Sequence, residues 1–281
     1  MRVALVRAKR QPEATAILGT YSEQARAIAI GSWRARALHE HRSAAVFSRL
    51  LPQLIAAEAG REYQVTVLRM AMDELHHASL CQEVVALLGG DPDVEGDLGT
   101  EALPEHVSTT RLEAALRNVV FVGCMSETVA LAMLTEEREL TREPAIEHVI
   151  AQLAADEMLH ARLGWAFLAE TWPRLDEAAR ARTCAYLPRA LRYLEQKMLE
   201  VMPEAPSAQL PPVSVIDEAR ALGVLEPREA RALLYQVIHG VVLPRLEDHG
   251  LPAADAWARR CELAEVGTGS ETRADTSDSE V

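Results

Sequence analysis

An eight-residue pattern occurs twice in the chain, at residues 73–80 (DELHHASL) and at residues 156–163 (DEMLHARL). Both copies fit D-E-x-x-H-A-x-L, and each lies in a long stretch of helical periodicity. Within each copy the Glu and the His are three residues apart, about 300° around a helix, so both side chains point to one side. The repeat therefore predicts two similar helices, each presenting a carboxylate and an imidazole on one face.

These faces are apolar, which is unexpected for ionisable residues. Glu74 and His77 share a face with Met70 and Cys81. The second copy has the same character, and its face contains Leu153, Glu157, His160 and Gly164. An ionised carboxylate in a protein core costs several kcal/mol unless it is paired or binds a metal ion. We therefore expect both Glu-His pairs to have buried partners.

Helical periodicity predicts four long helices arranged as two hairpins. Their expected ranges are about 22–59, 61–88, 108–140 and 145–171. Pro52 should kink the first helix or end it a turn early, and Gly60 separates the first two helices. Ser108 and Thr109 are candidate N-caps of the third. Each copy of the repeat thus lies on the second helix of a hairpin.

The connection between the hairpins is long and rich in Gly, Pro and acidic residues (89–107). Long loops are uncommon in compact domains, and this one would carry the chain back along the bundle, so that the second and third helices run parallel. No strand pattern is evident. The chain therefore reads as all-α: a four-helix bundle with a long crossover between helices 2 and 3, plus extra C-terminal helices.

The predicted division of the chain follows this pattern. Further helical stretches are expected at about 175–200, 214–222 and 227–247. The last 17 residues are polar and acidic, and we expect them to be disordered. The expected parts are an N-terminal extension (1–21), the bundle (22–172), C-terminal helices packed on it (173–264) and an acidic tail (265–281).

The facing helices supply two more carboxylates. Glu127 lies on an apolar face of the third helix. The turn between the third and fourth helices lies about 15 residues after Glu127 and about 15 residues before Glu157, so the two carboxylates are level. On the first helix, Glu58 would lie roughly 20 Å from the level of Glu74, at 1.5 Å per residue. Glu40 is level with about residue 80 and shares its face with apolar side chains. We therefore choose Glu40.

The combined set is one Glu from each of two helices and a Glu-x-x-His from each of the other two. Its members are Glu40, Glu74, His77, Glu127, Glu157 and His160. This arrangement is the one found in di-iron and di-manganese carboxylate bundles. Four carboxylates and two imidazoles suit two ions of intermediate hardness rather than tetrahedral zinc. We expect two Fe ions, while di-Mn or mixed Mn/Fe centres stay open.

This constellation resembles the ferritin-like di-iron carboxylate superfamily. Intervals of 34 residues from Glu40 to Glu74 and 30 from Glu127 to Glu157 look like those of its oxygenase and reductase-subunit branches. The local text around Glu40 and Glu74 is also similar to bacterial ferritin-like domain proteins, and the C-terminal segment loosely resembles the extra helices of arylamine N-oxygenases. The resemblance implies that Asp73 and Asp156 accept the second ring N–H of the ligand histidines, each from the opposite hairpin.

Two positions depart from relatives in the superfamily. Cys81 stands one turn after His77, where the small subunit of ribonucleotide reductase carries its radical tyrosine, so a radical-generating role of that kind is not expected. Leu131 stands one turn after Glu127, where several monooxygenases carry a Thr. We therefore predict an apolar pocket above the metal ions, lined by Cys81, Cys124 and Leu131.

These features favour a non-haem di-iron oxidoreductase that activates O2 to oxidise a small, mostly apolar substrate. The alternatives are a ferroxidase or iron-handling protein and a peroxide-detoxifying protein. No flavin or nicotinamide motif appears, so electrons would come from an external donor. The residues after 173 favour an oxygenase over iron storage, and they could roof a substrate pocket or form a homodimer interface.

Charge and composition exclude other classes. The net charge of −13 opposes binding to nucleic acids and anionic membrane surfaces. The chain contains no run of 18 uninterrupted apolar residues, so no transmembrane helix is predicted, and the N-terminus lacks a secretory signal pattern. The four cysteines are widely scattered, which is typical of a reducing cytoplasm rather than of a disulfide framework. We therefore expect a cytoplasmic protein.

Overall fold

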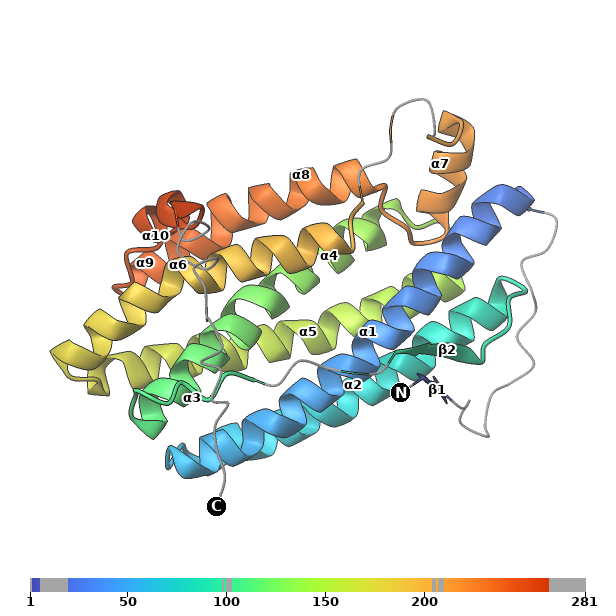
Figure 1. The fold of residues 1–281 in the computed structure, drawn as a ribbon. Coiled ribbons are helices and arrows are strands. Elements are labelled where there is room, and N and C mark those ends of the chain that lie inside the picture. The colour runs from blue at the N-terminus through green and yellow to red at the C-terminus, as the bar shows by residue number, and fades with distance from the viewer. Residues whose placement is uncertain are drawn as a thin grey trace, which may run out of the picture.

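Four long helices form two hairpins, each made of two antiparallel helices (Figure 1). The computed structural model describes residues 2–5, 20–97, 99, 103–203, 206 and 210–262. The four helices are α1 (Glu23–Ala56), α2 (Arg61–Leu87), a composite third helix and α5 (Pro144–Thr171). The third consists of α3 (Arg111–Val119), the π-helical segment η1 (Val120–Ser126) and α4 (Glu127–Leu140). The crossover makes α2 and the third helix run in the same direction, which confirms the predicted topology.

Local capping explains where the helices begin. The Ser22 side chain accepts a hydrogen bond from the Ala25 amide (3.2 Å) and starts α1, which continues through Pro52 to Ala56. The third helix starts later than predicted, at Arg111. Its N-cap is Thr110, whose extended backbone lets the hydroxyl accept from the Glu113 amide (3.2 Å). The predicted caps Ser108 and Thr109 precede it, so that part of the prediction is wrong.

A short antiparallel sheet was not expected from the sequence. Strand β1 (Arg2–Leu5) pairs with β2 (Val94–Asp97) within the crossover, with Arg2 opposite Asp97. The strand β2 lies against α1, and a Cβ at Gly96 would approach Leu38 Cδ1 to 2.5 Å. Strands of four residues carry too little alternation to be recognised in a sequence.

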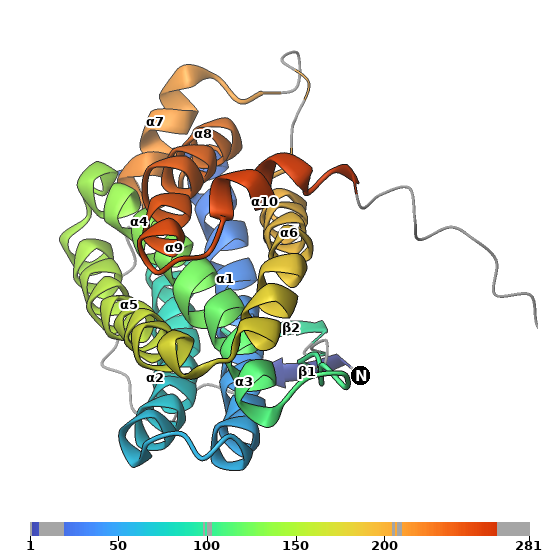
Figure 2. The same cartoon turned by 90° about the vertical axis from the view of Figure 1, so that its left-hand side faces the viewer.

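The C-terminal helices pack on the bundle on the side away from α2 (Figure 2). They are α6 (Glu177–Glu200), α7 (Val213–Ala221), α8 (Pro227–Val237), the π-helical η4 (Ile238–Val242), α9 (Leu243–Asp248) and α10 (Ala253–Arg259). A 3₁₀ turn, η2 (Trp172–Arg174), connects α5 to α6. Helices were predicted at the positions of α6 to α9, whereas α10 is an addition. The predicted acidic tail (265–281) and most of the N-terminal extension lie outside the described residues.

Two hydrophobic clusters fill the bundle, one toward each end. The first contains Phe47, Met70, Cys124 and Phe167, and it extends under α6 and α8–α10. The second contains Trp33, Cys81, Leu134, Ile150 and Leu222. The segment Arg111–Leu140 is long and apolar enough to cross a membrane by composition, but 67% of its most apolar window is buried in the bundle. Its apolar character is therefore that of a core helix.

Candidate metal centre

Six ionisable side chains meet in the layer between the two clusters. They are Glu40 of α1, Glu74 and His77 of α2, Glu127 of α4, and Glu157 and His160 of α5, and all six are buried. Each bundle helix thus contributes to the layer. The alternative carboxylate, Glu58, lies in the exposed turn between α1 and α2 with a positive φ of 54°. The structure therefore places Glu40, and not Glu58, beside the other five side chains.

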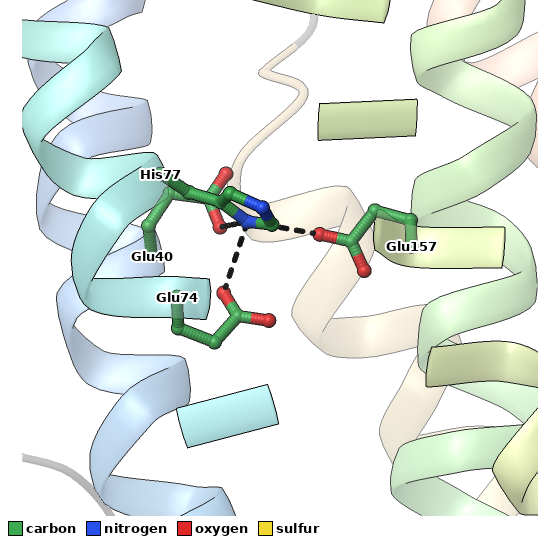
Figure 3. Close-up of side chains that lie close together, drawn as sticks. All are labelled: Glu40, Glu74, His77 and Glu157. Atoms are coloured by element: carbon green, nitrogen blue, oxygen red, sulfur yellow. Dashed lines mark ion pairs between the residues drawn. The ribbon is translucent and has the colours of Figure 1, made fainter. Parts of the chain in front are cut away.

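The six side chains form two groups that overlap. One group contains Glu40, Glu74, His77 and Glu157 (Figure 3), and the other contains Glu74, Glu127, Glu157 and His160. Within each group, one ligand atom from every residue lies within 4.8 Å of the others. Glu74 and Glu157 belong to both groups. Three carboxylates and one imidazole around each of two points, with two carboxylates shared, fit a pair of bridged metal ions.

The histidine of the first group has a ring nitrogen aimed at the carboxylates. His77 Nδ1 lies 3.5 Å from Glu157 Oε1 and 3.9 Å from an oxygen of both Glu40 and Glu74. This Nδ1 atom is buried and makes no hydrogen bond to any residue that the structure describes. Buried polar atoms are normally satisfied. An unsatisfied imidazole nitrogen facing three carboxylates is what a site for a divalent cation requires.

The second group is tighter. His160 Nδ1 lies 3.1 Å from Glu157 Oε2, 3.2 Å from Glu74 Oε1 and 3.5 Å from Glu127 Oε2. The two imidazole rings are 6.0 Å apart, centre to centre. Both histidines therefore present Nδ1 to the carboxylate layer from neighbouring helices.

The opposite ring nitrogens contact the two aspartates that precede the glutamates. His77 Nε2 lies 3.2 Å from Asp156 Oδ2, and His160 Nε2 lies 3.5 Å from Asp73 Oδ2. Each aspartate belongs to the other hairpin, which is the crossed arrangement expected from the sequence. An acceptor at Nε2 places the proton there and leaves the Nδ1 lone pair for a metal ion.

Burial and mutual repulsion shift the acidities of the carboxylates in the layer. Burial raises the pKa of Glu74 and of Glu127, and repulsion from neighbouring carboxylates adds to the shift. Burial also disfavours the ionised forms of Glu40 and Glu157, but the nearby histidines and neighbouring carboxyl groups lower their pKa values overall. The layer thus contains two carboxylates that ionise more readily than usual and two that ionise less readily.

The histidines respond in the opposite direction. Burial opposes the charged imidazolium, yet the nearby carboxylates of Glu157 and Glu40 raise the pKa of His77 to about 11. The pKa of His160 is raised as well, because contacts with Glu127, Glu157 and Glu74 outweigh burial. Without metal ions, protonated histidines therefore supply the positive charge that the carboxylates need.

A close helix crossing holds the third helix against α5 at this level. Gly123 of η1 faces Gly164 of α5, one turn beyond His160. A Cβ at Gly164 would lie 2.4 Å from Gly123 C and 2.7 Å from Cys124 N, so only glycine fits. The π-helical turn ends at Ser126, directly before Glu127. The crossing therefore sets how far Glu127 reaches toward Glu157.

The predicted pocket of Cys81, Cys124 and Leu131 is not formed as one site. Cys81 belongs to one hydrophobic cluster and Cys124 to the other, while Leu131 is half-buried. The reason is direction: α2 and the third helix run parallel, so a residue after His77 and a residue before Glu127 lie on opposite sides of the metal layer. The prediction placed both on one side.

A partly buried ion pair near Cys81 escaped the sequence analysis. Arg36 Nη2 contacts both oxygens of Glu137, at 2.5 and 2.7 Å, and its guanidinium lies over the Trp33 ring (4.7 Å). Burial lowers the pKa of the Arg36 guanidinium, but the nearby Glu137, together with Cys81 and Glu40, raises it overall. The signal available in the sequence was Arg36, one turn before Glu40 on the same apolar face.

Comparison with solved structures supports the fold. The chain is similar to "Protein 19 with aldehyde deformylating oxidase activity from Synechococcus", with a TM-score of 0.56 and 18% sequence identity. The match covers 86% of this chain and 98% of that one. A search of curated proteins found no match.

A family model gives the more specific result. The model described as "P-aminobenzoate N-oxygenase AurF" matches residues 10–242. This range includes the whole bundle, all six clustered side chains and the C-terminal helices as far as η4. Because the match covers well over half of the chain, the protein belongs to the P-aminobenzoate N-oxygenase AurF family and is a di-iron oxygenase of the ferritin-like superfamily that uses two iron ions and O2.

Proposed function

We propose that this enzyme transfers an oxygen atom from O2 to the amino nitrogen of a small, mostly apolar aromatic amine. The family model is described by such a reaction, on p-aminobenzoate. The observation that carries the assignment to this chain is the pair of overlapping ligand groups that share Glu74 and Glu157. Two hydrophobic clusters enclose the layer, which suits a reaction that must exclude water.

Each of the six residues has a defined role in this proposal. Glu40 and His77 would hold one iron ion, and Glu127 and His160 would hold the other. Glu74 and Glu157, which belong to both groups, would contribute to both sites. When bound, the iron pair supplies the reductive activation of O2 and the transfer of oxygen. Asp156 and Asp73 hold the imidazole rings in the tautomer that leaves Nδ1 free.

The reaction requires electrons from outside the chain. Converting an amine R–NH2 with O2, two electrons and two protons gives the hydroxylamine R–NHOH and one water. One oxygen atom forms the new N–O bond and the other leaves as water, so the substrate supplies only part of the reducing power. We propose that a separate electron donor delivers the two electrons, because the sequence shows no flavin or nicotinamide motif.

Iron content and product analysis test this proposal. The purified chain is loaded with Fe(II) without O2, its iron is counted by mass spectrometry, and O2 is then added with p-aminobenzoate or aniline. We expect two irons per chain and a hydroxylamine or nitro product. Consumption of O2 without an organic product, together with formation of an iron mineral, would support iron handling and contradict the proposal.

A pair of matched variants tests the ligand assignment. Glu40→Gln removes a carboxylate from the first group and should lower the iron content below two per chain. Glu58→Gln makes the same change at the alternative carboxylate, in the turn after α1 and outside the cluster, and should retain two irons. Equal iron in both variants would remove Glu40 from the site.

A further inference from the structure

A buried thiol lies beside the metal layer, on the side of the second hydrophobic cluster. Cys81 follows His77 by four residues on α2 and is 0% exposed. Residues three and four apart share one face of a helix, so Glu74, His77 and Cys81 point to the same side. Neither metal binding nor the proposed oxidation of an amine uses this thiol. The fold thus brings a sulfur atom, which is easily oxidised, to within one helical turn of a metal ligand.

The charges that act on the thiol identify its neighbours. Burial raises the pKa of Cys81 well above its ordinary value, the charge of Glu40 adds to the rise, and the charge of Arg36 opposes it. Glu137 and Glu74 raise the same pKa further. The influence is mutual, because Cys81 contributes to the raised pKa of Arg36. The thiol therefore lies close both to two carboxylates of the metal layer and to the Arg36 guanidinium.

Arg36 has an unsatisfied donor in this region. Its Nη2 contacts both oxygens of Glu137, but its Nη1 is buried and makes no hydrogen bond to any described residue. Buried polar atoms are normally satisfied. An oxygen atom bonded to the sulfur of Cys81 would provide an acceptor near this donor. The unsatisfied Nη1 is thus an observation, separate from the thiol itself, that favours an added oxygen at this place.

The other three cysteines lack this combination. Cys124 is also 0% exposed, but it belongs to the first hydrophobic cluster, on the opposite side of the layer. Burial raises the pKa of Cys124 and the charge of Arg245 opposes the rise, with no contribution from a described carboxylate of the layer. Cys184 is half-buried and Cys261 is exposed. Cys124 is therefore the natural comparison for Cys81.

We propose that Cys81 is an oxidation site of this enzyme, and that its thiol becomes a sulfenic acid when O2 reacts at the reduced iron pair without an amine. One oxygen atom of O2 forms the new S–O bond, and the other leaves as water. The sulfur loses two electrons, and each Fe(II) ion loses one. The balance is Cys–SH + O2 + 2 Fe(II) + 2 H⁺ → Cys–S–OH + H2O + 2 Fe(III). The new oxygen accepts a hydrogen bond from Arg36 Nη1.

This inference rests on the metal assignment within the proposed function, but not on the amine substrate. Diffusing oxidants attack thiols that are exposed and ionised. Cys81 is neither, because it is fully buried and its pKa is raised. Its oxidation therefore requires an oxidant that forms inside the bundle, next to the thiol.

A single exposure of the reduced protein to O2 tests the site. The full chain is loaded with Fe(II) without O2, amine or electron donor, and O2 is then added together with catalase, which destroys peroxide that diffuses away. Unfolding in dimedone traps sulfenic acids, and peptide mass spectrometry locates the adducts. We expect about 10-fold more adduct at Cys81 than at Cys124, because the two thiols are equally buried and Cys81 adjoins the layer.

Two controls separate internal oxidation from attack by a diffusing reagent. H2O2 added to the metal-free chain should follow exposure, and so modify Cys261 first and Cys81 last. Cys81→Ala should abolish the main adduct formed with Fe(II) and O2. Cys124→Ala makes the same change at an equally buried thiol and should retain that adduct. The adduct map of the unaltered chain decides the matter even if a variant fails to fold.

The outcomes distinguish this site from the proposed function. If Cys81 remains a thiol after the Fe(II) is oxidised, the inference is overturned, even where amines are converted to hydroxylamines. Oxidation at Met70 or Cys124 instead would overturn it too, because both belong to the first hydrophobic cluster. A Cys81 adduct in a protein that oxidises no amine would support the inference and contradict the proposed function. An adduct that catalase abolishes would assign the oxidation to free peroxide and overturn the inference.

Discussion

Charge balance among the six clustered residues explains how the layer exists without metal ions. Lowered pKa values favour the ionised forms of Glu40 and Glu157, and raised pKa values favour the protonated forms of Glu74 and Glu127. Both imidazoles are protonated at neutral pH, since the pKa of His77 rises to about 11 and that of His160 is raised too. The two imidazolium charges offset negative charge on the carboxylates. With two Fe(II) ions, four ionised carboxylates and neutral imidazoles, the charges cancel.

This balance predicts that metal binding releases protons. Protons on the histidines, and on the carboxyl groups whose pKa values are raised, must leave before all six side chains can act as ligands, so binding of two divalent ions should release protons. Because protons compete with the metal, affinity should rise as pH increases from 6 to 8. Anaerobic calorimetry with Fe(II) in two buffers of different ionisation enthalpy measures the number released. A binding heat independent of the buffer would contradict the assignment.

The aspartate beside His77 offers a second test at single-residue scale. Asp156→Ala leaves His77 Nε2 without its acceptor, so the imidazole loses its fixed tautomer and orientation. We expect iron affinity to fall about 10–100-fold, as measured by competition with a chelator. Asp255→Ala on α10 is the control, because that side chain is 62% exposed and pairs with Arg259 of the same helix, away from the centre. Equal affinities in the two variants would assign Asp156 no role at the centre.

Single residues were predictable where a helical repeat fixed their direction. The two Glu-x-x-His pairs follow from spacing alone, and Glu40 follows from hairpin register. The prediction that Cys81 and Cys124 line one pocket failed, because it depended on the direction of each helix along the bundle as well as on its apolar face. The partly buried pair of Arg36 and Glu137 was missed because an ion pair 101 residues apart in sequence leaves no local pattern.

Among the secondary-structure elements, η1 is the least predictable. Its residues would suit an α-helix equally well, so the π-helical turn reflects packing of the third helix against α5 rather than local preference. Gly123 and Gly164 allow that packing, since their backbones approach so closely that a Cβ on either residue would clash with the other helix. The helix ends, in contrast, follow caps and breaks that the sequence displays, such as Ser22 and Gly60.

The glycine crossing predicts a large effect from one methyl group. Gly164→Ala would place Cβ 2.4 Å from Gly123 C, and backbone atoms cannot move aside without shifting a helix. We expect a loss of about 1–3 kcal/mol in unfolding free energy, measured by urea denaturation, and reduced iron binding. Gly31→Ala is the matched control within α1, because nothing lies within 4 Å of its added Cβ. It should stabilise the protein by about 0.5–1 kcal/mol and keep full iron content.

Should Gly164→Ala retain both its stability and two irons per chain, the close crossing would be unnecessary for the centre. Loss of iron with unchanged stability would instead show that the crossing serves the site alone. The two measurements therefore separate a structural role of Gly164 from its effect on the position of Glu127.

At the scale of the whole molecule, the polar layer divides the core, and the C-terminal region closes one end of it. Trp33 Nε1 donates to the carbonyl of Leu222 (3.0 Å), and Gly223, with a φ of +79°, packs against Ile150 and Trp33. The sequence predicted extra helices but not this contact, because a turn after α7 carries no signal of what it covers. All four cysteines are free, in agreement with the prediction that none forms a disulfide.

Because the metal layer connects all four bundle helices, iron should stabilise the whole fold. A ligand that binds only the native state adds about 2.7 kcal/mol when its free concentration is 100 times its dissociation constant. For a chain of this size, each kcal/mol raises Tm by roughly 2–4 °C. We therefore expect anaerobic Fe(II) to raise the Tm by about 5–10 °C, as measured by calorimetry, and a chelator to reverse the change. Glu157→Ala, which lacks a shared carboxylate, should show little or no increase. A Tm that stays constant while mass spectrometry finds two irons per chain would mean that the ions bind outside this layer.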